Sequence, residues 1–482
     1  MQNVRLEKIN EIKQHINTLI LLDKEASLEV KGLTDEELYY VRKEFDNKST
    51  QIILNRYTEW VIIQTFDKSR KTSQTKEQLR KDGASASRYI RQTKTEDVQI
   101  IDYCGNPSFI KAFVEGILLG NYQFNKYLKD PSEKESKLKT IYVLSFDMIQ
   151  KDWEVLSNVI QAVYYTRDLV NEPPTTLTAV TLSEEFTKLA KDAGLQIEVM
   201  DKARIEALRM NGLLAVNRGS IIPPTFTVLT WKPEKAGNSK PIVLVGKGIA
   251  YDTGGYSLKP TPDSMDSMKS DMAGAATVAS VMYAIAKNNL PVYCMALIPS
   301  TDNHIGASAY MPGDIITYSD GTSVEVMNTD AEGRLILADA LLYAKQLNPE
   351  LLITIATLTG SAHKAIGTQG MVGMGNLPEE TIQKIIQAGD EEYERIALFP
   401  FWDEYKDSLK SEIADLKNIG GGNAGAITAG KFLEHFTDYP YFHLDIAGVA
   451  FFSRADNYRL AGGTGIGVRL LYHFLENFSK LR

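Results

Sequence analysis

Cysteine is scarce in this sequence, and long apolar runs are absent. The two cysteines, Cys104 and Cys294, are far apart and share no spacing typical of a metal or redox motif, so we expect buried thiols in a reducing compartment. No stretch approaches the ~18 consecutive apolar residues of a membrane helix, and the N-terminus lacks the apolar core of a signal peptide. These absences predict a cytoplasmic protein without a membrane segment.

Several common catalytic and nucleotide-binding motifs are also missing. There is no Gly-x-Ser-x-Gly, no His-Glu-x-x-His and no P-loop. Residues 420–425 fit Gly-x-Gly-x-x-Gly, but they follow the charged segment 410–417 rather than a buried strand, which argues against a dinucleotide site. The net charge of -8 disfavours a nucleic-acid surface. The histidines are scattered, and we interpret each as structural or surface-lying: His15, His304, His363, His435, His443 and His473.

The composition is that of a globular protein of about two domains, with 482 residues, 44% of them apolar and 24% charged. Strand and helix patterns alternate through the first part of the chain. The predicted strands are 17–22, 51–54, 58–66, 97–103 and 140–146, and the predicted helices are 107–127 and 152–171. We place the domain boundary near residue 150, which gives α/β domains over 1–150 and 151–482.

The second domain is predicted to contain a largely parallel sheet. Its strands are continuously apolar, as expected when helices cover both faces; they are 241–245, 292–297 and 351–356. Two helices begin just after acidic residues, with Asp271 before 272–287 and both Asp330 and Glu332 before 335–346. Open α/β sheets carry their sites where strands lead into helices, so these side chains are candidates for a functional site.

Four carboxylates, Asp252, Asp271, Asp330 and Glu332, have no histidine near them in the sequence. Each one alone fits a solvated or helix-capping residue. Four of them between buried strands would be costly to fold without cations. Oxygen-rich sets suit hard or borderline divalent ions, and two ions ~3.5–4 Å apart need bridging carboxylates. The combined pattern predicts a dinuclear hydrolase site that needs no side-chain nucleophile.

The residues around these carboxylates resemble those of the leucine aminopeptidase family, also called cytosol aminopeptidases. Asn-Thr-Asp-Ala-Glu-Gly-Arg-Leu at residues 328–335 matches the family signature without a change, and residues 246–259 match a second block. Further agreement extends over residues 160–475. The N-terminal part matches only weakly, so its macro-like α/β fold is implied by the resemblance, as is the catalytic role of the larger domain with its mostly parallel central sheet.

The resemblance implies a two-metal aminopeptidase that uses a metal-bridging water as its nucleophile. One metal would be held by Asp252, Asp330 and Glu332, and the other by Lys247, Asp252, Asp271 and Glu332. The ions would be Zn2+ or Mn2+, with Mg2+ or Co2+ able to replace the looser one. The free amino group of the substrate would bind the second metal, so only peptides with an unblocked N-terminus would be cut.

The same resemblance implies roles for Lys259 and Arg334. Lys259 would stabilise the oxyanion formed at the scissile carbonyl. Arg334 would hold a bicarbonate ion that accepts the proton of the attacking water, because an intervening anion makes a guanidinium beside two cations acceptable. The substrate would contact an apolar wall suited to Leu or Met, formed by Met268, Thr357, Gly360, Ala447 and Ala450. Asn328 and Leu358 are further residues that the resemblance assigns to substrate binding.

A homohexamer with its catalytic domains at the centre is also implied. One departure from the family is the interval from Lys259 to Asp271, which is one residue longer than is common and contains two prolines; we expect it to change the rim of the pocket. Three alternatives are a two-metal phosphatase or other amidohydrolase, a nucleic-acid-binding regulator and an inactive scaffold. The lysine ligand and the arginine disfavour the first, and the filled motif positions disfavour the last.

Overall fold

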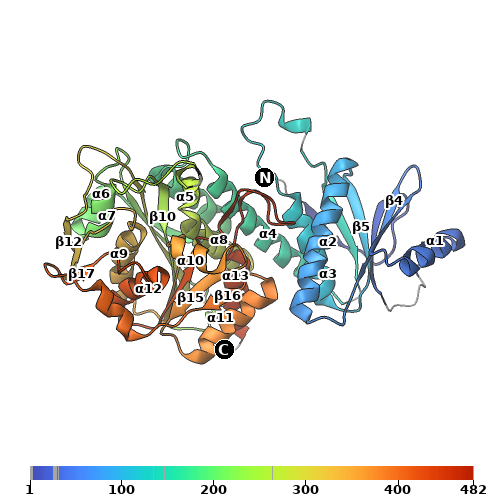
Figure 1. Cartoon of the computed structure of the whole chain (residues 1–482). Coiled ribbons are helices and arrows are strands. Elements are labelled where there is room, and N and C mark those ends of the chain that lie inside the picture. The colour runs from blue at the N-terminus through green and yellow to red at the C-terminus, as the bar shows by residue number, and fades with distance from the viewer. Residues whose placement is uncertain are drawn as a thin grey trace. The chain divides into compact units, whose positions relative to one another are not determined.

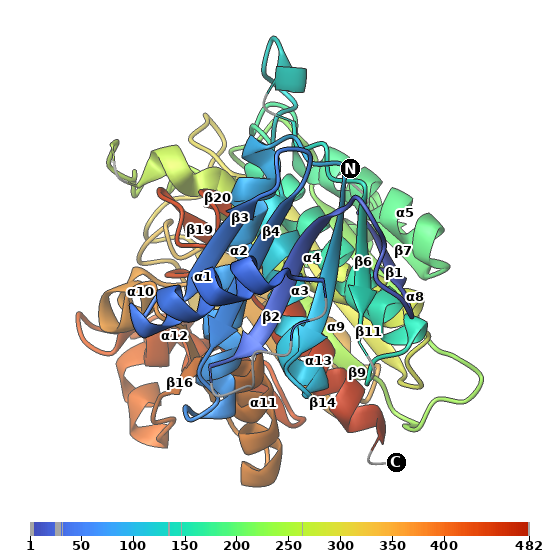
Figure 2. The ribbon, with the colours of Figure 1, turned by 90° about the vertical axis from the view of Figure 1, so that its right-hand side faces the viewer.

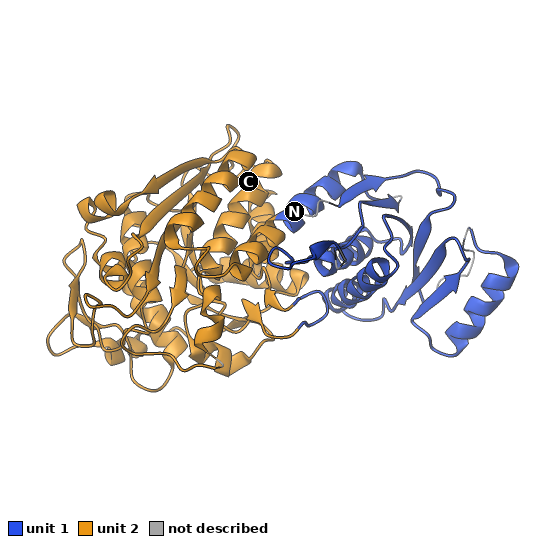
Figure 3. Cartoon of the chain, turned by 90° about the horizontal axis from the view of Figure 1, so that it is seen from above, with its two compact units in different colours: residues 1–161, 455–460 blue, residues 162–454, 461–482 orange. Residues whose placement is uncertain are grey.

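The computed structural model describes residues 4–24, 30, 32–133, 135–145, 147–262 and 264–480. The chain divides into two compact units, residues 1–161 with 455–460 and residues 162–454 with 461–482 (Figures 1 and 3). Phe146, the last residue of one predicted strand, lies outside the described residues, as does Asp263 in the longer loop. Within the described ranges, no helix has the length and apolar character needed to cross a membrane.

The first unit is a six-stranded sheet covered by helices, as the alternating pattern predicts. Strands β1, β6, β5, β2 and β4 run parallel in that order, and β3 joins β4 in antiparallel register at the edge. Helix α1 lies on one face of the sheet, and α2 and α3 pack together on the other (Figures 1 and 2). The elements are β1 Arg5–Lys8, β2 Asn17–Asp23, α1 Asp35–Asp46, β3 Gln51–Asn55, β4 Trp60–Phe66, α2 Thr72–Gln92, β5 Asp97–Tyr103, α3 Pro107–Asn121 and β6 Thr140–Leu144.

The second unit is built on a nine-stranded sheet in which β18, β14, β9 and β11 run parallel and β10 pairs with β11. Strands β8 and β15 are antiparallel to their neighbours β11 and β18. The prediction of a mostly parallel sheet is confirmed. The strands of this sheet are β7 Gln196–Met200, β8 Thr225–Trp231, β9 Ile242–Gly246, β10 Gly248–Asp252, β11 Cys294–Asn303, β14 Leu351–Ala356, β15 Met371–Gly375, β16 Ile396–Leu398 and β18 Tyr441–Asp445.

Helices cover both faces of this sheet. On one face α8 packs on β9, β11 and β14 and against α5 and α13, and on the other α9 packs on β9 and β11 and against α7 and α12. Helix α4 runs from the first unit into the second. The helices are α4 Gln150–Asn171, α5 Ala179–Ala193, α6 Lys202–Ala207, α7 Asn211–Asn217, α8 Ala273–Lys287, α9 Gly333–Lys345, α10 Gly360–Ile366, α11 Glu379–Glu392, α12 Gly425–His435 and α13 Val468–Lys480.

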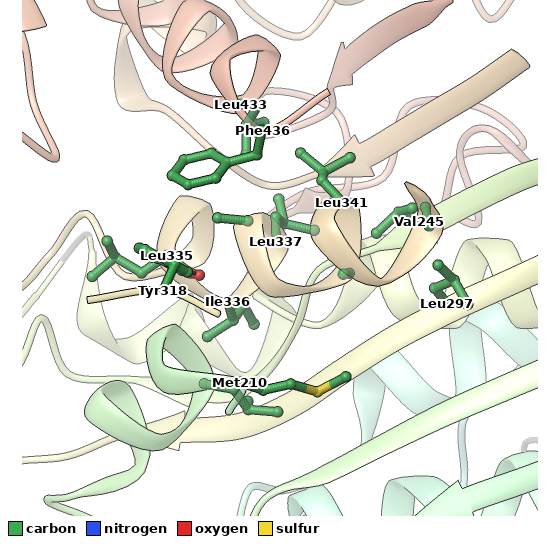
Figure 4. Packing of buried hydrophobic residues seen from close by; sticks show 14 of the residues in the cluster. Met210, Val245, Leu297, Tyr318, Leu335, Ile336, Leu337, Leu341, Leu433 and Phe436 are labelled. Atoms are coloured by element: carbon green, nitrogen blue, oxygen red, sulfur yellow. Dashed lines mark hydrogen bonds between the residues drawn. The ribbon is translucent and has the colours of Figure 1, made fainter. Parts of the chain in front are cut away.

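The main core of the second unit surrounds helix α9. In Figure 4, Leu433 and Phe436, at the end of α12, lie on one side of α9. Val245 and Leu297 of the sheet belong to the same core. Every residue from Gly333 to Leu341 is buried. This packing fixes the position of the first turn of α9, which carries part of the candidate site described below.

Several element boundaries differ from the sequence-based expectation, and three of them have a clear physical reason. The predicted helix 107–127 ends at Asn121, because Gly120 and Asn121 have low helix propensity. The predicted strand 58–66 begins at Trp60, since Tyr57 takes a left-handed conformation with φ of 68° in the turn before it. The predicted strand 292–297 starts at Cys294 and continues to Asn303. It pairs with β8 from Cys294 to Ser300 and with β10 from Ser300 to Asn303, which buries polar residues that the apolar pattern alone does not include.

Candidate active site

The predicted functional residues converge at the carboxyl ends of the parallel strands. Lys247 lies between β9 and β10, and Asp252 is the last residue of β10. Thr357 follows β14, which pairs with β9. Glu332 immediately precedes α9, and Asp271 ends the 3-10 turn Met265–Ser270. Segments that are far apart in the sequence therefore supply one site at the edge where such sheets bind ligands.

Lys247 is the buried cation at the centre of this site. Its Nζ lies 2.8 Å from Asp271 Oδ2 and 2.8 Å from Glu332 Oε1. It also donates a hydrogen bond of 2.9 Å to the carbonyl oxygen of Thr357. The side chain is only 3% exposed. Burial by itself would lower the pKa of Lys247, but Asp271, Glu332 and Asp252 raise it above its ordinary value.

Gly333 provides the space that the Lys247 side chain occupies. A Cβ atom at position 333 would contact Lys247 Cε and would lie 2.7 Å from its Nζ. Contacts this short are not tolerated without movement of one partner. The glycine in the family signature therefore allows the first turn of α9 to lie directly against the lysine.

Lys259 joins two other carboxylates. Its Nζ lies 2.9 Å from Asp252 Oδ2 and 2.6 Å from Asp330 Oδ1. Asp252 Oδ1 accepts hydrogen bonds from the backbone N–H of Gly254 at 2.8 Å and from Asn303 Nδ2 at 2.7 Å. At 13% exposed, the side chain of Lys259 is more accessible than that of Lys247. The two lysines therefore divide the four carboxylates into two pairs, and of the four only Asp330, at 32% exposed, is partly open to solvent.

The arrangement fits divalent cations. Ligand atoms of Asp252, Asp271 and Glu332 all lie within 4.8 Å of one another. Glu332 Oε2 is buried and has no hydrogen-bond partner within the described part of the chain. Asp330 lies next to this group, paired with Lys259 and with its side chain 32% exposed. Four carboxylates facing two lysines leave an excess of two negative charges, which buried sites normally neutralise with metal ions.

The protonation of the carboxylates reflects this excess. Burial raises the pKa of Asp271 to about 7, although Lys247 opposes the shift. Burial, together with Glu332 and Asp271, raises the pKa of Asp252 well above its ordinary value. Glu332 differs, because its two lysine neighbours outweigh burial and lower its pKa. Among the chain's own groups, protons and the two lysines thus both reduce the negative charge of the cluster.

Arg334 lies in the first turn of α9 and is 6% exposed. Its Nη1 donates a hydrogen bond of 2.7 Å to the carbonyl oxygen of Asn418, and its Nε has no hydrogen-bond partner among the described residues. Burial lowers the pKa of Arg334 to about 10, against the raising effect of Glu332 and Asp445. The guanidinium stays charged at neutral pH and retains a free donor that could bind an anion.

Asn303 is a site residue that the sequence patterns do not indicate. Its Nδ2 donates to Asp252 Oδ1 at 2.7 Å and to the carbonyl oxygen of Thr329 at 3.0 Å, so it connects the two carboxylate-bearing loops. Asn303 could have been found as a polar residue at the end of a buried strand. The predicted strand 292–297 ends six residues before it. Asn328 also has a local role, because its Oδ1 accepts the N–H of Asp330 at 2.7 Å and shapes the loop.

The residues predicted to contact substrate occupy the loops after two neighbouring strands. Thr357, Leu358 and Gly360 follow β14, whereas Ala447 and Ala450 follow β18, and these strands pair in parallel. Met268 comes from the 3-10 turn that ends at Asp271, and Thr357 Oγ1 donates to Asp271 Oδ1 at 2.8 Å. A Cβ atom built on Gly360 would meet no other atom within 4 Å, so this side of the loop is open.

Comparison with known proteins decides the family. Residues 164–472 match the catalytic domain of the cytosol aminopeptidase family. This chain belongs to that family. A probable cytosol aminopeptidase of Chlorobaculum tepidum is 45% identical over 76% of this chain and 75% of its own length. Another, from Clostridium perfringens, is 36% identical over 98% of this chain and 95% of its own length.

Solved structures agree with this family membership. The bottromycin maturation enzyme BotP in complex with Mn has a TM-score of 0.85 and 27% identity, and the match covers 96% of this chain and 100% of that one. A tomato leucine aminopeptidase mutant has a TM-score of 0.85 and 26% identity, over 98% and 96% of the two chains. The resemblance and the α/β fold class drawn from the sequence are confirmed. The chain is an aminopeptidase and therefore a hydrolase, and its family is metal-dependent. The acidic cluster of this chain suits divalent ions.

A substitution at Gly333 tests whether close packing of α9 on Lys247 holds the site together. Gly333→Ala should displace the Lys247 side chain and break its contacts with Asp271 and Glu332. We expect aminopeptidase activity to fall by at least about tenfold, since an effect of ~1.4 kcal/mol suffices for that, while circular dichroism stays unchanged.

Gly321→Ala provides the matched control, because a Cβ there would meet no atom within 4 Å. Alanine strains the backbone more at position 321, where φ is +94°, than at position 333. Gly321→Ala should nevertheless keep its activity. If Gly333→Ala were as active as the unaltered enzyme, close packing against Lys247 would not matter for the site.

Proposed function

We propose that this chain is a two-metal leucyl-type aminopeptidase that releases apolar residues such as Leu or Met from the unblocked N-termini of short peptides. The observation that carries the proposal is the buried group of Asp252, Asp271 and Glu332, which lies beside the loops predicted to bind the first side chain of the substrate. Family membership gives the reaction type. The site geometry supports the finer assignment of residues.

The donor set suggests how two ions would be held. Asp252, Asp330 and Glu332 would bind one ion. Asp252, Asp271 and Glu332 would bind the other together with Lys247, whose ammonium group must first lose its proton because only the neutral amine can act as a ligand. When bound, the ions would polarise the scissile carbonyl and acidify the water that attacks it. The complex of BotP with Mn supports manganese as one candidate. Zinc is the other main candidate, and Mg2+ or Co2+ could replace the more weakly held ion.

We assign the stabilisation of negative charge on the substrate oxygen to Lys259. It is the more exposed of the two lysines in the site. Its ammonium group is already held by Asp252 and Asp330, so its position is set before substrate binds. Lys247 is enclosed by Asp271, Glu332 and the carbonyl of Thr357 and is less suited to meet a substrate.

Arg334 would hold a small anion, and bicarbonate is the candidate. Its buried guanidinium has an Nε without a partner among the described residues, and one anion would satisfy this donor and lower the positive charge near the metals. A bound bicarbonate would also provide a base to accept a proton from water. No carboxylate in the site is free for that task if all four are ligands.

The first side chain of the substrate would lie against Met268, Thr357 and Gly360, with Ala447 and Ala450 opposite. These are apolar or small residues, and the open side of Gly360 leaves room for a side chain the size of Leu or Met. Hydrophobic pockets separate side chains by roughly 1–3 kcal/mol per methylene group. The preference should therefore be strong against Gly and Ala.

A homohexamer remains part of the proposal. In the second unit, Trp402 and Ile413 are each 65% exposed, and Met311 is 52% exposed. Contact with another chain would cover these side chains, and a continuous apolar patch rather than single exposed residues is what marks such a surface. Light scattering at the concentration used for assays measures the assembly directly.

A panel of aminoacyl amides tests the proposed activity. The purified chain should hydrolyse leucyl and methionyl amides at least about tenfold faster than glycyl amide. It should not hydrolyse the N-acetylated leucyl amide. Removal of metals with a chelator should abolish turnover, and Mn2+ or Zn2+ should restore it. Hydrolysis of a phosphate ester without any hydrolysis of the amides would favour the two-metal phosphatase instead.

Truncation of Lys259 tests its assigned role. Lys259→Ala should lower kcat by about 10²–10³, the usual effect of losing a group that stabilises a developing oxyanion, with a smaller change in KM. Lys287→Ala is a suitable control, because this lysine lies at the end of α8 and contacts Asp192 on the surface. An unchanged kcat with a raised KM would assign Lys259 to substrate binding instead.

A further inference from the structure

Asp445 is a buried carboxylate that the proposed mechanism does not use. It is the last residue of β18 and pairs in register with Ala356, the last residue of β14. It is 1% exposed. In the described part of the chain, no lysine or arginine lies within ion-pair distance of it, although its charge raises the pKa of the more distant Arg334. A carboxylate buried without a cation is costly unless hydrogen bonds compensate, so its position calls for an explanation.

The hydrogen bonds of Asp445 all go to the loops that follow these two strands. Its Oδ1 accepts the N–H of Leu358 at 3.2 Å and the N–H of Ala447 at 3.1 Å. Its Oδ2 accepts the hydroxyl of Thr359 at 2.7 Å. Thr359 in turn caps helix α10, because its Oγ1 accepts the N–H of Ala362 at 3.0 Å. One carboxylate thus fixes the two loops relative to each other.

These loops contain most of the residues assigned to the pocket for the first side chain of the substrate. Thr357, Leu358 and Gly360 are on one side, and Ala447 and Ala450 on the other. Burial raises the pKa of Asp445, and the bonds from Thr359, Ala447 and Leu358 act in the opposite direction. The carboxylate therefore has partners for both oxygens, and all of them are in the loops that form the pocket.

We propose that Asp445 is a positioning residue that sets the width of this pocket and so the preference of the enzyme for large apolar side chains. The inference rests on the proposed function for the identity of the pocket. Loss of Asp445 would let the two loops move independently, and a displacement of ~1 Å is enough to alter how a substrate is held. A small side chain such as Ala uses little of the pocket and should be affected less than Leu.

The test compares kcat/KM for leucyl and alanyl amides in the fully metallated enzyme. Asp445→Ala should lower the leucyl-to-alanyl ratio by about tenfold or more. Asp445→Asn should keep a ratio close to that of the unaltered enzyme, because its amide oxygen can accept both backbone N–H groups and its NH2 can donate to the Thr359 hydroxyl. Recovery by Asn and loss by Ala would identify the hydrogen bonds as the cause.

Asp339→Ala is the matched control for lost stability. Asp339 is also buried, at 2% exposed, and accepts a backbone N–H, that of Leu213, at 2.7 Å. It lies on α9 and bonds to the start of α7, away from the two pocket loops. This variant should lower the melting temperature without changing the leucyl-to-alanyl ratio. An equal change of the ratio in both variants would show that general destabilisation, not pocket shape, is responsible.

A second variant and a hydrogen-exchange measurement provide two further tests. If Asp445→Ala does not fold, Thr359→Val removes the bond to Oδ2, together with the cap of α10, and should still reduce the ratio. Hydrogen exchange at the amides of Leu358 and Ala447 should be faster in Asp445→Ala than in Asp339→Ala. A leucyl preference that persists in Asp445→Ala contradicts the inference alone. An unaltered enzyme that does not distinguish leucyl from alanyl amide contradicts the proposed specificity as well.

Discussion

The contact of Lys247 with Asp271 and Glu332 is the interaction on which the rest of the site depends. It places a buried ammonium group 2.8 Å from each of two carboxylates at the edge of the sheet. With Lys259, Asp252 and Asp330, the site holds two more negative groups than positive ones. Such an excess is unfavourable in a buried site. Divalent cations would relieve this excess, which is the physical reason for proposing a metal centre at this site.

The fold accommodates this cluster because glycines let helices lie close to it and because the N-terminus of a helix points toward it. Gly333 lets α9 lie against Lys247, and Gly274 lets α8 approach Ile355, with the Lys247 backbone nitrogen close by. Glu332 stands at the N-terminus of α9, where the helix dipole favours a negative charge. The core around α9 then holds that helix end in place (Figure 4). The packing of the apolar core around α9 therefore determines where the charged side chains of the site lie.

The sequence predicts much of the site because its residues cluster in short motifs, and it predicts less of what connects them. Asp252, Asp271 and Glu332 could be grouped because they precede or follow recognisable elements. Asn303 was not predicted, because β11 continues past its apolar part. Its role comes from its hydrogen bonds to Asp252 and to the carbonyl oxygen of Thr329. Asp445 lies within a matching motif, but its bonds depend on the register of β14 and β18. Long-range contacts of this kind leave no periodic signal in the sequence.

Metal binding by the stripped protein tests the central claim most directly. The chain should be freed of metal with a chelator, dialysed and titrated with Mn2+ or Zn2+ while bound metal and melting temperature are measured. We predict two ions per chain, with a melting temperature that rises as they bind, because the ions replace protons on buried carboxylates. The same titration of Glu332→Gln should show weaker binding of both ions. A metal-free chain with full activity and an unchanged melting temperature would contradict the account.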